Sequence, residues 1–373
     1  MDEKSGKSRK RVEKYSMKVL SIIGARPQFV KEAIVQQELK KANIEEVLVH
    51  TGQHYDENMS GIFFEVLEMS EPNINLGIHG KTHGAMTGAM LMELEKIMIQ
   101  EKPDGVILYG DTDSTLAGAL AAVKLKLPVA HIEAGLRQEP KDMPEEINRV
   151  LTDRISTWLF APSKRGMENL EFEHLSENAV FTGDVMYDIF LQMEPSFNDR
   201  YIKELNLTPE EYIVMTLHRD FNVDHREVLE EILNNVQKIS KDYPVVLPLH
   251  PRTKKRIEEF DLHSYLDGLH LLEPIDYLEL MGLTKECKYV ITDSGGFQKE
   301  SYFSGKRAIV LMPDTSWKEL VEERINLLSS PEKLLDRSME ILEPINFRQD
   351  IYGNGDAAKK IVDYLKKHLP SEK

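Results

Sequence analysis

The chain has 373 residues, which is too long for one hydrophobic core and long enough for two α/β domains that each bury their own. Asp and Glu number 63 against 47 Lys and Arg, and the formal net charge of -16 at pH 7 opposes binding to nucleic acid or to an anionic membrane. The single cysteine, Cys287, excludes an internal disulfide, and with no apolar run of membrane-spanning or signal-peptide length the composition predicts a soluble, cytoplasmic protein.

The first residues, 1–16, are polar and carry most of their charge as Lys and Arg, so we expect a disordered lead. From Met17 the sequence alternates short apolar runs with amphipathic segments, which predicts a doubly wound α/β domain over 17–188. The predicted strands are VLSIIG at 19–24, VLVHTG at 47–52, GVILYG at 105–110 and PVAHIEAG at 128–135. Helices are predicted from Pro27, near 86–100, from Thr115 and from Pro144.

The first predicted helix places two cations near the end of the first strand. Pro27 suits the first helical turn, and Lys31 falls one turn from the strand end. Arg26 and Lys31 are therefore predicted to face the same crevice. The alternative is a pair of surface cations at a helix start, which is common in globular proteins.

Polar segments follow the second and third predicted strands. The stretch at 51–64, TGQHYDENMSGIFF, holds His54 and Asp56. No further ligand shares their spacing, which favours a loop that orders over a substrate rather than a metal site. Asp111 and Asp113 directly follow the strand GVILYG. A helix cap would explain one of these acids, but it explains two less well.

The segment 128–156 holds three candidate site residues. Glu133 ends a strand, Arg137 follows a glycine turn, and Glu145 opens a helix. Acids at a helix start complement its dipole, and Glu145 lies one turn from Arg149, so a structural role explains Glu145 well. Glu133 has no such structural explanation. The apolar face of this helix consists of Ile147, Val150, Leu151 and Ile155.

The alternation of strands and helices repeats after a change in texture near residue 188, which predicts a second domain over 189–356. Its predicted strands are YIVMTLH at 212–218, VVLPLH at 245–250, YVITDS at 289–294 and RAIVLM at 307–312. An amphipathic helix at 357–373 is expected to pack back on the first domain.

The stretch KYVITDSGGFQKESYFSGK, at 288–306, predicts a strand, a tight turn and a helix that begins at Phe297. Gly295 and Gly296 are expected to allow backbone conformations and close approaches that other residues do not. Free N–H groups at the helix start beside Ser294 would then form an anion site. The alternative is an ordinary turn between a strand and a helix, with glycines at its corner.

A titratable residue follows each of five buried strands: Asp111, Glu133, His218, His250 and Asp293. Ligands of open α/β sheets bind outside the carboxyl ends of the strands, so these side chains are predicted to gather around a cleft between two domains. The sequence has no Gly-x-Gly-x-x-Gly after the first strand and no Gly-Lys-Ser/Thr loop, which indicates neither a dinucleotide cofactor nor ATP hydrolysis. An anion clamp facing several carboxylates fits a phosphorylated sugar.

Seven motifs in this order resemble those of the non-hydrolysing UDP-N-acetylglucosamine 2-epimerase family: GARPQFVKEA, TGQHYDENMS, GDTDSTLAGALAA, HIEAGLR, MPEEINR, TLHRDFNVD and TDSGGFQKES. The match runs from Met17 to near the C-terminus. The resemblance implies a GT-B-like pair of Rossmann-type domains with a cleft between them and a homodimer. It also implies a UDP-amino sugar substrate and no nicotinamide, metal or flavin cofactor.

The resemblance carries over to individual residues of this sequence. It implies that Asp111, Glu133 and Glu145 are catalytic carboxylates and that His218 is the active-site histidine. UDP would be eliminated, a 2-acetamidoglucal would form, and UDP would add back as a proton reaches the other face of carbon 2. Arg26 and Lys31 would lie near the diphosphate, the turn at 294–296 would hold it, and Glu300 would accept from the ribose hydroxyls. With Arg137 and His250 added from the turn and strand ends above, the substrate-binding candidates are Arg26, Lys31, Arg137, His250, Ser294, Gly295, Gly296 and Glu300.

The sequence departs from the pattern of many relatives at Phe221, at Leu280 and at Pro313, which puts contacts with the nucleotide in question more than the chemistry. GQHYD and MPEEINR also resemble the branch that acts on UDP-2,3-diacetamido-uronic acid sugars. Three other functions stay open: a hydrolysing epimerase, a GT-B glycosyltransferase and a non-catalytic nucleotide-sugar sensor. The cluster of carboxylates argues against the last two.

Overall fold

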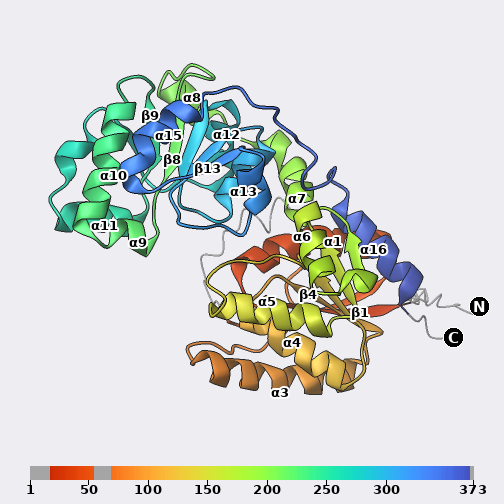
Figure 1. Cartoon of the computed structure of the whole chain (residues 1–373). Coiled ribbons are helices and arrows are strands. Elements are labelled where there is room, and N and C mark those ends of the chain that lie inside the picture. The colour runs from red at the N-terminus through yellow and green to blue at the C-terminus, as the bar shows by residue number, and fades with distance from the viewer. Residues whose placement is uncertain (1–16, 54–68, 370–373) are drawn as a thin grey trace, which may run out of the picture. The chain divides into compact units, whose positions relative to one another are not determined.

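The computed structural model describes residues 17–53 and 69–369 and contains two parallel β-sheets with interleaved helices (Figure 1). The strands of the first sheet are β1 Lys18–Ile23, β2 Glu45–His50, β3 Ile74–Asn75, β4 Gly105–Tyr109, β5 Val129–Ile132, β6 Trp158–Ala161 and β7 Ala179–Phe181. Their order across the sheet is β3-β2-β1-β4-β5-β6-β7. The strands of the second sheet are β8 Ile213–Thr216, β9 Val245–Pro248, β10 His270–Leu272, β11 Tyr289–Thr292, β12 Ala308–Val310 and β13 Asn326–Leu328. Their order is β10-β9-β8-β11-β12-β13.

The helices fall between these strands. In the first half of the chain they are α1 Arg26–Lys41, α3 His83–Glu101, α4 Asp113–Lys124, α5 Pro144–Ile155, α6 Lys164–Phe172 and α7 Val185–Met193. In the second half they are α8 Arg200–Glu204, α9 Asp220–Val223, α10 Arg226–Ile239, α11 Pro251–Glu259, α12 Tyr277–Glu286, α13 Phe297–Phe303, α14 Lys318–Glu322, α15 Leu334–Glu340 and α16 Ala357–His368. Short 3-10 helices occur at Ser176–Asn178, Glu194–Ser196, His263–Leu266 and Pro331–Lys333. The eight strands predicted from the sequence are confirmed, and so is the doubly wound α/β class.

By its internal contacts the chain divides into two compact units. One comprises Met1–His131, Ile155–Trp158 and Ala358–Lys373, and the other comprises Ile132–Arg154 and Leu159–Ala357. This division groups most of β6 and all of β7 with the second half of the chain, and the linear boundary near residue 188 stays a prediction. Within the described ranges, no helix combines the length and the hydropathy that a membrane-spanning segment needs.

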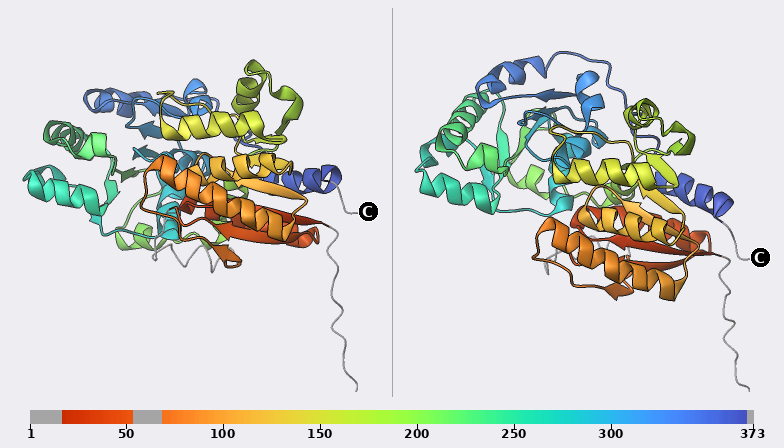
Figure 2. Two further views of the ribbon diagram at one scale, coloured as in Figure 1. Left: turned by 90° about the horizontal axis from the view of Figure 1, so that it is seen from below. Right: turned by 60° about the horizontal axis from the view of Figure 1, so that its bottom comes forward.

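Small residues on α4 bring that helix close to β1 and β4 in the first unit. A Cβ atom added to Gly118 would lie 2.7 Å from Ile22 Cδ1 and 2.8 Å from Leu108 Cδ2, so a larger side chain would push the helix away from the sheet. Beside α4 lies α3, as Figures 1 and 2 both show. The buried residues of α3 recur every fourth position, as a helix with one inward face requires. They are Met86, Met90, Leu94 and Met98.

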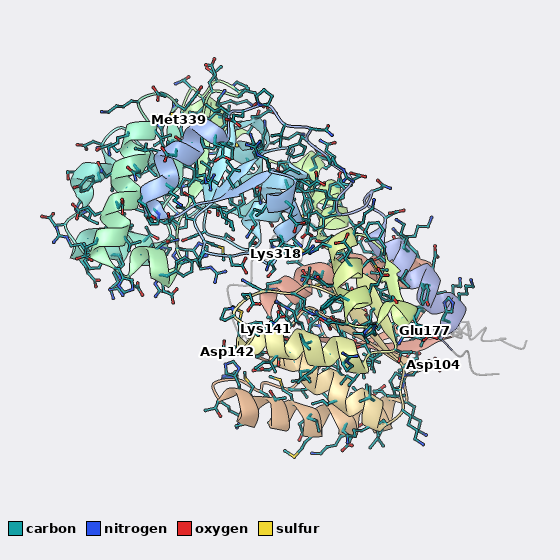
Figure 3. All side chains as sticks on the ribbon, viewed as in Figure 1. Asp104, Lys141, Asp142, Glu177, Lys318 and Met339 are labelled. Carbon is teal, nitrogen blue, oxygen red and sulfur yellow. The ribbon has the colours of Figure 1, made fainter. Side chains whose placement is uncertain are left out.

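The second unit buries α10 against the second sheet and against α15. The inward residues of α10 recur at helical spacing and form one apolar face: they are Leu229, Ile232, Leu233, Val236 and Ile239. Met339 on α15 is 65% exposed and marks the solvent side of that helix (Figure 3).

The carboxyl group of Glu32 on α1 is fully buried in the first unit. Among the described residues, neither of its carboxylate oxygens has a partner at hydrogen-bond distance and angle. Burial raises the pKa of Glu32 well above its usual value, and the charge of Glu46 adds to the shift. Glu46 itself accepts hydrogen bonds from Ser21 Oγ at 2.5 Å and from Gln36 Nε2 at 3.0 Å. The raised pKa favours the protonated form of Glu32.

We predict that Glu32→Gln flattens the pH dependence of stability. A carboxyl whose pKa is higher in the folded state makes folding less favourable as pH rises above its ordinary value of 4.5. The amide does not titrate, so at pH 8 the variant should be more stable than the wild type by roughly 1 to 3 kcal/mol, with no difference near pH 4. Chemical denaturation at both pH values measures this, and the partly exposed Glu38→Gln on the same helix is the control. An unchanged pH dependence would contradict the prediction.

Candidate functional site

The buried carboxylate of Asp293, directly after β11, organises the strand ends of the second sheet. It accepts hydrogen bonds from the backbone N–H of His218 at 3.0 Å and of Arg219 at 2.8 Å, and from Asn222 Nδ2 at 3.2 Å. His218 Nδ1 lies 3.1 Å from a carboxylate oxygen. Because β8 and β11 are parallel neighbours with Thr216 opposite Thr292, both loops leave the sheet at the same edge. Asp293 thus fixes the loop that carries His218.

The charge of Asp293 is maintained by these donors. Burial alone would raise its pKa, but hydrogen bonds from His218 and from the Arg219 backbone outweigh burial and lower the pKa below its usual value. His250 lies beside this pair, with its ring centroid 5.4 Å from that of His218. Burial lowers the pKa of His250, and the neighbouring His218 adds to the effect. The neutral ring accepts a hydrogen bond from Arg252 N–H at 3.2 Å and so caps α11.

The glycine turn at 294–296 presents backbone rather than side chain at this edge. Ser294 Oγ accepts from Phe297 N–H at 3.3 Å, and Trp317 Nε1 donates to the Gly295 carbonyl at 2.9 Å. Neither glycine has a left-handed φ, so the expectation of a conformation closed to other residues is wrong here. A Cβ atom on Gly296 would meet nothing within 4 Å. The open space in front of Gly296 therefore leaves its backbone accessible.

The helix that follows this turn carries two further ionisable residues. Glu300 is partly exposed in the first turn of α13. Lys299 is 4% exposed, forms an ion pair with Asp184, and lies 3.7 Å from Glu133 Oε1. Its ammonium also lies 3.7 Å from the centroid of the Trp317 ring. The structure thus brings Glu133 to α13 through Lys299. The sequence reasoning missed Lys299 and Asp184, although the position of Lys299 within the motif TDSGGFQKES gave a signal.

The α5 segment turns its polar side inward. The buried residues of α5 are Glu146, Asn148, Arg149, Thr152 and Asp153. By contrast, Ile147 and Leu151 from the predicted apolar face are 45% and 46% exposed. Glu145 is exposed, and Arg149 donates to Glu146 Oε2 at 2.7 Å. The carboxylate that pairs with Arg149 is therefore that of Glu146, whereas the sequence predicted Glu145.

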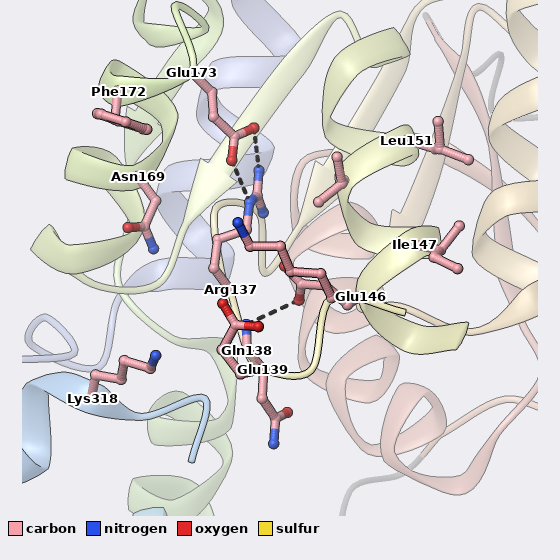
Figure 4. A pocket seen from close by; sticks show the side chains of 12 residues that line it. Arg137, Gln138, Glu139, Glu146, Ile147, Leu151, Asn169, Phe172, Glu173 and Lys318 are labelled. Carbon is pink, nitrogen blue, oxygen red and sulfur yellow. Dashed lines mark hydrogen bonds and ion pairs between the residues drawn. The ribbon is translucent and has the colours of Figure 1, made fainter. Parts of the chain in front are cut away.

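Arg137 is held by two carboxylates at the edge of a pocket of about 550 Å³ (Figure 4). Its guanidinium donates to both oxygens of Glu173 at 2.6 and 2.8 Å and to Asp153 at 2.8 Å. Burial alone would lower the pKa of Arg137, but the bonds to Glu173 and Asp153 outweigh it and raise the pKa. Ile147 and Leu151 line the same pocket.

The first unit holds the remaining candidates. Asp111 is partly exposed after β4, and Lys31 is buried in α1. Thr112 caps α4 by accepting from Thr115 N–H, so the alternative that an aspartate caps this helix is wrong. Asp113 instead pairs with His83 Nδ1 at 2.8 Å. Arg26 begins α1, but its side chain lies outside the described part of the structure.

The residues considered for metal binding, His54 and Asp56, also lie outside the described residues. Within the described ranges, no three His, Cys, Asp or Glu side chains come together as a metal site requires.

Two of the three positions expected to depart from many relatives share a second pocket. Phe221 and Pro313 both line a cavity of about 420 Å³ in the second unit, together with Asn222. Leu280 lies on α12 and packs, partly buried, against a hydrophobic core of that unit.

Comparisons with known proteins agree with this fold and these motifs. A sequence model described as UDP-N-acetylglucosamine 2-epimerase matches residues 37–366. The chain is 43% identical over 361 residues to a UDP-N-acetylglucosamine 2-epimerase homolog of Methanococcus maripaludis, covering 94% of this chain and 99% of that protein. It is 44% identical over 360 residues to UDP-2,3-diacetamido-2,3-dideoxy-D-glucuronate 2-epimerase of Pseudomonas aeruginosa, covering 94% and 100%.

Solved structures show the same similarity. The UDP-GlcNAc 2-epimerase of Methanocaldococcus jannaschii, in complex with UDP-GlcNAc and UDP, has a TM-score of 0.80 and 40% identity, and the match covers 94% of this chain and 100% of that one. The enzyme from Neisseria meningitidis bound to UDP-GlcNAc has a TM-score of 0.81 and 31% identity, with 94% and 100% covered. The family resemblance and the GT-B-like class with two Rossmann-like domains are thereby confirmed.

We predict that Asp293→Asn destabilises the protein at neutral pH. An amide retains the shape of the carboxyl group but loses the negative charge that strengthens its hydrogen bonds to the surrounding donors. The free energy of unfolding at pH 7 should therefore fall by roughly 1.5 to 3 kcal/mol. The carboxylate has a lowered folded pKa, so its contribution is present above the ordinary value of 3.8 and disappears as pH falls through the folded value. The difference between variant and wild type should therefore shrink in acid.

Urea denaturation at pH 7 and at low pH measures this difference. Asp242→Asn, which changes an exposed carboxylate in the same unit, is the matched control and should have little effect. Equal losses for the two variants at pH 7 would show that the buried network is not the cause.

Proposed function

We propose that this chain, which belongs to the UDP-N-acetylglucosamine 2-epimerase family, converts UDP-N-acetylglucosamine to UDP-N-acetylmannosamine. The reaction eliminates UDP, passes through a 2-acetamidoglucal, and adds UDP back after a proton reaches the other face of carbon 2. The observation that carries the proposal is the accessible backbone at Gly296 beside the loop that Asp293 fixes. A structure of a relative at 40% identity holds UDP-GlcNAc and UDP.

The second-unit residues bind the nucleotide in this proposal. The N–H groups of Gly295 and Gly296 donate to the diphosphate, because an accessible backbone free of side chains lets phosphate oxygens approach closely. The N–H of Ser294 donates to Thr292 Oγ1 at 2.9 Å, so Ser294 contributes its hydroxyl to this site. Glu300, partly exposed one turn further along α13, accepts from the ribose hydroxyls. His218 and His250 complete this edge of the second sheet, with His218 oriented by Asp293 at 3.1 Å.

The carboxylates perform the chemistry in this proposal. The hydrogen on carbon 2 is not next to a carbonyl and is barely acidic, so UDP has to leave early and an oxocarbenium-like charge develops. One carboxylate stabilises that charge, and another removes the proton. Inversion needs a proton donor on each face, which is why more than one carboxylate is required, and Asp111, Glu133 and Glu145 are the three that the resemblance implies. Arg26 and Lys31 stabilise the departing diphosphate, and Arg137 orders the turn after Glu133 through its bonds to Asp153 and Glu173.

A second substrate deserves equal testing. The relative from Pseudomonas aeruginosa, at 44% identity, is named for UDP-2,3-diacetamido-2,3-dideoxy-D-glucuronate. That sugar differs at carbons 3 and 6 and undergoes inversion at the same carbon 2. The same elimination mechanism therefore applies to both substrates.

We predict that the enzyme, incubated with UDP-N-acetylglucosamine in heavy water, places deuterium at carbon 2 of the product without accumulating UDP. A proton delivered by a solvent-exchanging carboxyl carries the isotope of the solvent. Proton NMR of one sample follows both carbon 2 and UDP. Return of the original hydrogen in an epimerised product would refute the elimination mechanism, steady release of UDP would show a hydrolysing enzyme, and an unlabelled carbon 2 would fit a glycosyltransferase or a sensor.

Two variants locate this chemistry. Asp111→Asn and Glu133→Gln should each slow the appearance of deuterium by on the order of a hundredfold or more while the protein remains folded. Absence of any reaction with the wild type directs the same experiment to the diacetamido-uronic substrate.

We also propose a homodimer that covers the exposed apolar side of α5. Ile147 and Leu151 are nearly half exposed on a helix whose polar side is buried, and Phe172, which lines the same pocket, is 87% exposed. Exposed apolar side chains gathered at one place mark an interaction surface. A second copy of the chain is the partner that the family resemblance implies.

We predict that the double variant Ile147→Lys with Leu151→Lys is monomeric, because two lysines add charge to a surface that a dimer would bury. Light scattering coupled to size-exclusion chromatography measures the mass. Met339→Lys introduces a charge at another exposed apolar position and is expected to leave the mass unchanged. A dimeric double variant would place the interface elsewhere.

A further inference from the structure

The ammonium of Lys299 is buried between groups from four segments of the second unit. It forms an ion pair with Asp184, the N-cap residue of α7, and lies 3.7 Å from Glu133 Oε1. The Trp317 ring covers it with the centroid at 3.7 Å, and the Tyr352 ring centroid lies at 5.6 Å. A lysine is rarely buried to this extent unless its charge is compensated, so its partners define its role.

The other ionisable groups around Lys299 do not compete strongly for its charge. Glu319 is buried, and among the described residues neither of its carboxylate oxygens has a partner at hydrogen-bond distance and angle. Burial raises the pKa of Glu319, while the charge of Lys299 acts in the opposite direction and does not overcome it. Burial also raises the pKa of Tyr352 well above its usual value. The charge of Lys299 is therefore shared chiefly between Asp184 and Glu133.

The backbone of Glu133 is held in an uncommon conformation. Its φ is 72°, in the left-handed region that favours glycine, and such a residue needs support from its surroundings. The N–H groups of Glu133 and Ala134 both donate to the Phe160 carbonyl at 3.1 Å. These hydrogen bonds fix the backbone from which the Glu133 side chain extends, and Lys299 lies next to the carboxylate at the other end of that side chain.

Trp317 links Lys299 to the glycine turn. The indole ring packs on the ammonium, and its Nε1 donates to the Gly295 carbonyl at 2.9 Å. Lys299 also lies on α13, the helix that follows this turn. One side chain and one helix thus connect the proposed diphosphate site to the carboxylate of Glu133.

We propose that Lys299 is a positioning residue that keeps the carboxylate of Glu133 ionised and oriented for proton transfer. A cation within about 4 to 6 Å favours the charged form of a carboxyl group, and the effect is larger where water is excluded. The role rests on the proposed function, because it acts through Glu133. Lys299 itself touches neither the substrate nor the reacting atoms in this proposal.

The test is the pH profile of kcat/KM for variants of Lys299. Lys299→Met should move the acid limb to higher pH by about one unit, since Glu133 then loses the cation that favours its charged form. Lys299→Arg restores the charge and should return the limb toward the wild-type position. Lys299→Met also leaves Asp184 buried without its cation. The double variant with Asp184→Asn removes both charges and should show the same shift if the single variant does not fold.

Two controls separate positioning from mere structural support. Asp184→Asn alone breaks the ion pair but keeps the cation, so its acid limb should stay in place or move to lower pH. Lys306→Met removes another buried lysine of the same unit, whose partner is Glu210, and should leave the limb unmoved. On a Glu133→Gln background, Lys299→Met should cost far less activity than on the wild type.

The outcomes are distinguishable from failure of the proposed function. If the wild type labels carbon 2 with deuterium while the acid limb of Lys299→Met superimposes on the wild-type limb, the role of Lys299 is overturned and the function stands. If Lys299→Met lowers activity by the same factor in the wild type and in Glu133→Gln, Lys299 does not act through Glu133. An absence of carbon-2 labelling with either UDP-amino sugar overturns the proposed function and this role with it.

Discussion

The arrangement of the second sheet's edge depends on one buried negative charge. Asp293 has no exposed surface, yet it is charged, because backbone N–H groups, an amide and a histidine surround it. Its position directly after β11, beside the parallel β8, lets one carboxylate hold the loop that leaves the neighbouring strand. A buried charge of this kind stabilises only while its donors are present. The loop with His218 and the carboxylate therefore constrain each other.

Much of this arrangement was predictable because parallel strands are continuous apolar runs that end at polar residues. The residues after β8, β9 and β11 are His218, His250 and Asp293, and the structure brings all three to one edge. Their identification required only the position of each strand end. What each group does there could not be predicted, because the donors to Asp293 lie 71 to 75 residues away along the chain.

The failures of prediction have specific physical causes. Helical periodicity identifies two faces of α5 but does not say which face is buried, and here ion pairs with Arg149 and Arg137 retain the polar face inside. A pair of glycines in a sequence can indicate either a left-handed backbone conformation or a position with open space beside the backbone. At Gly296 the structure shows open space and no left-handed φ. The left-handed φ of Glu133 could not be predicted from the sequence, because glutamate seldom adopts this conformation and its presence does not indicate it. Long-range contacts decide each of these cases.

Asn222 connects the buried carboxylate of Asp293 to the pocket that Phe221 and Pro313 line. Its Nδ2 donates both to Asp293 at 3.2 Å and to the Leu311 carbonyl at 2.9 Å. Leu311 and Asn222 line the pocket that also contains Phe221 and Pro313. Phe221 and Pro313 therefore share one pocket, and Asn222 attaches its wall to the same carboxylate that holds His218. Because Phe221 and Asn222 are neighbours on α9, a different side chain at position 221 changes the pocket without removing the bond that Asn222 donates to Asp293.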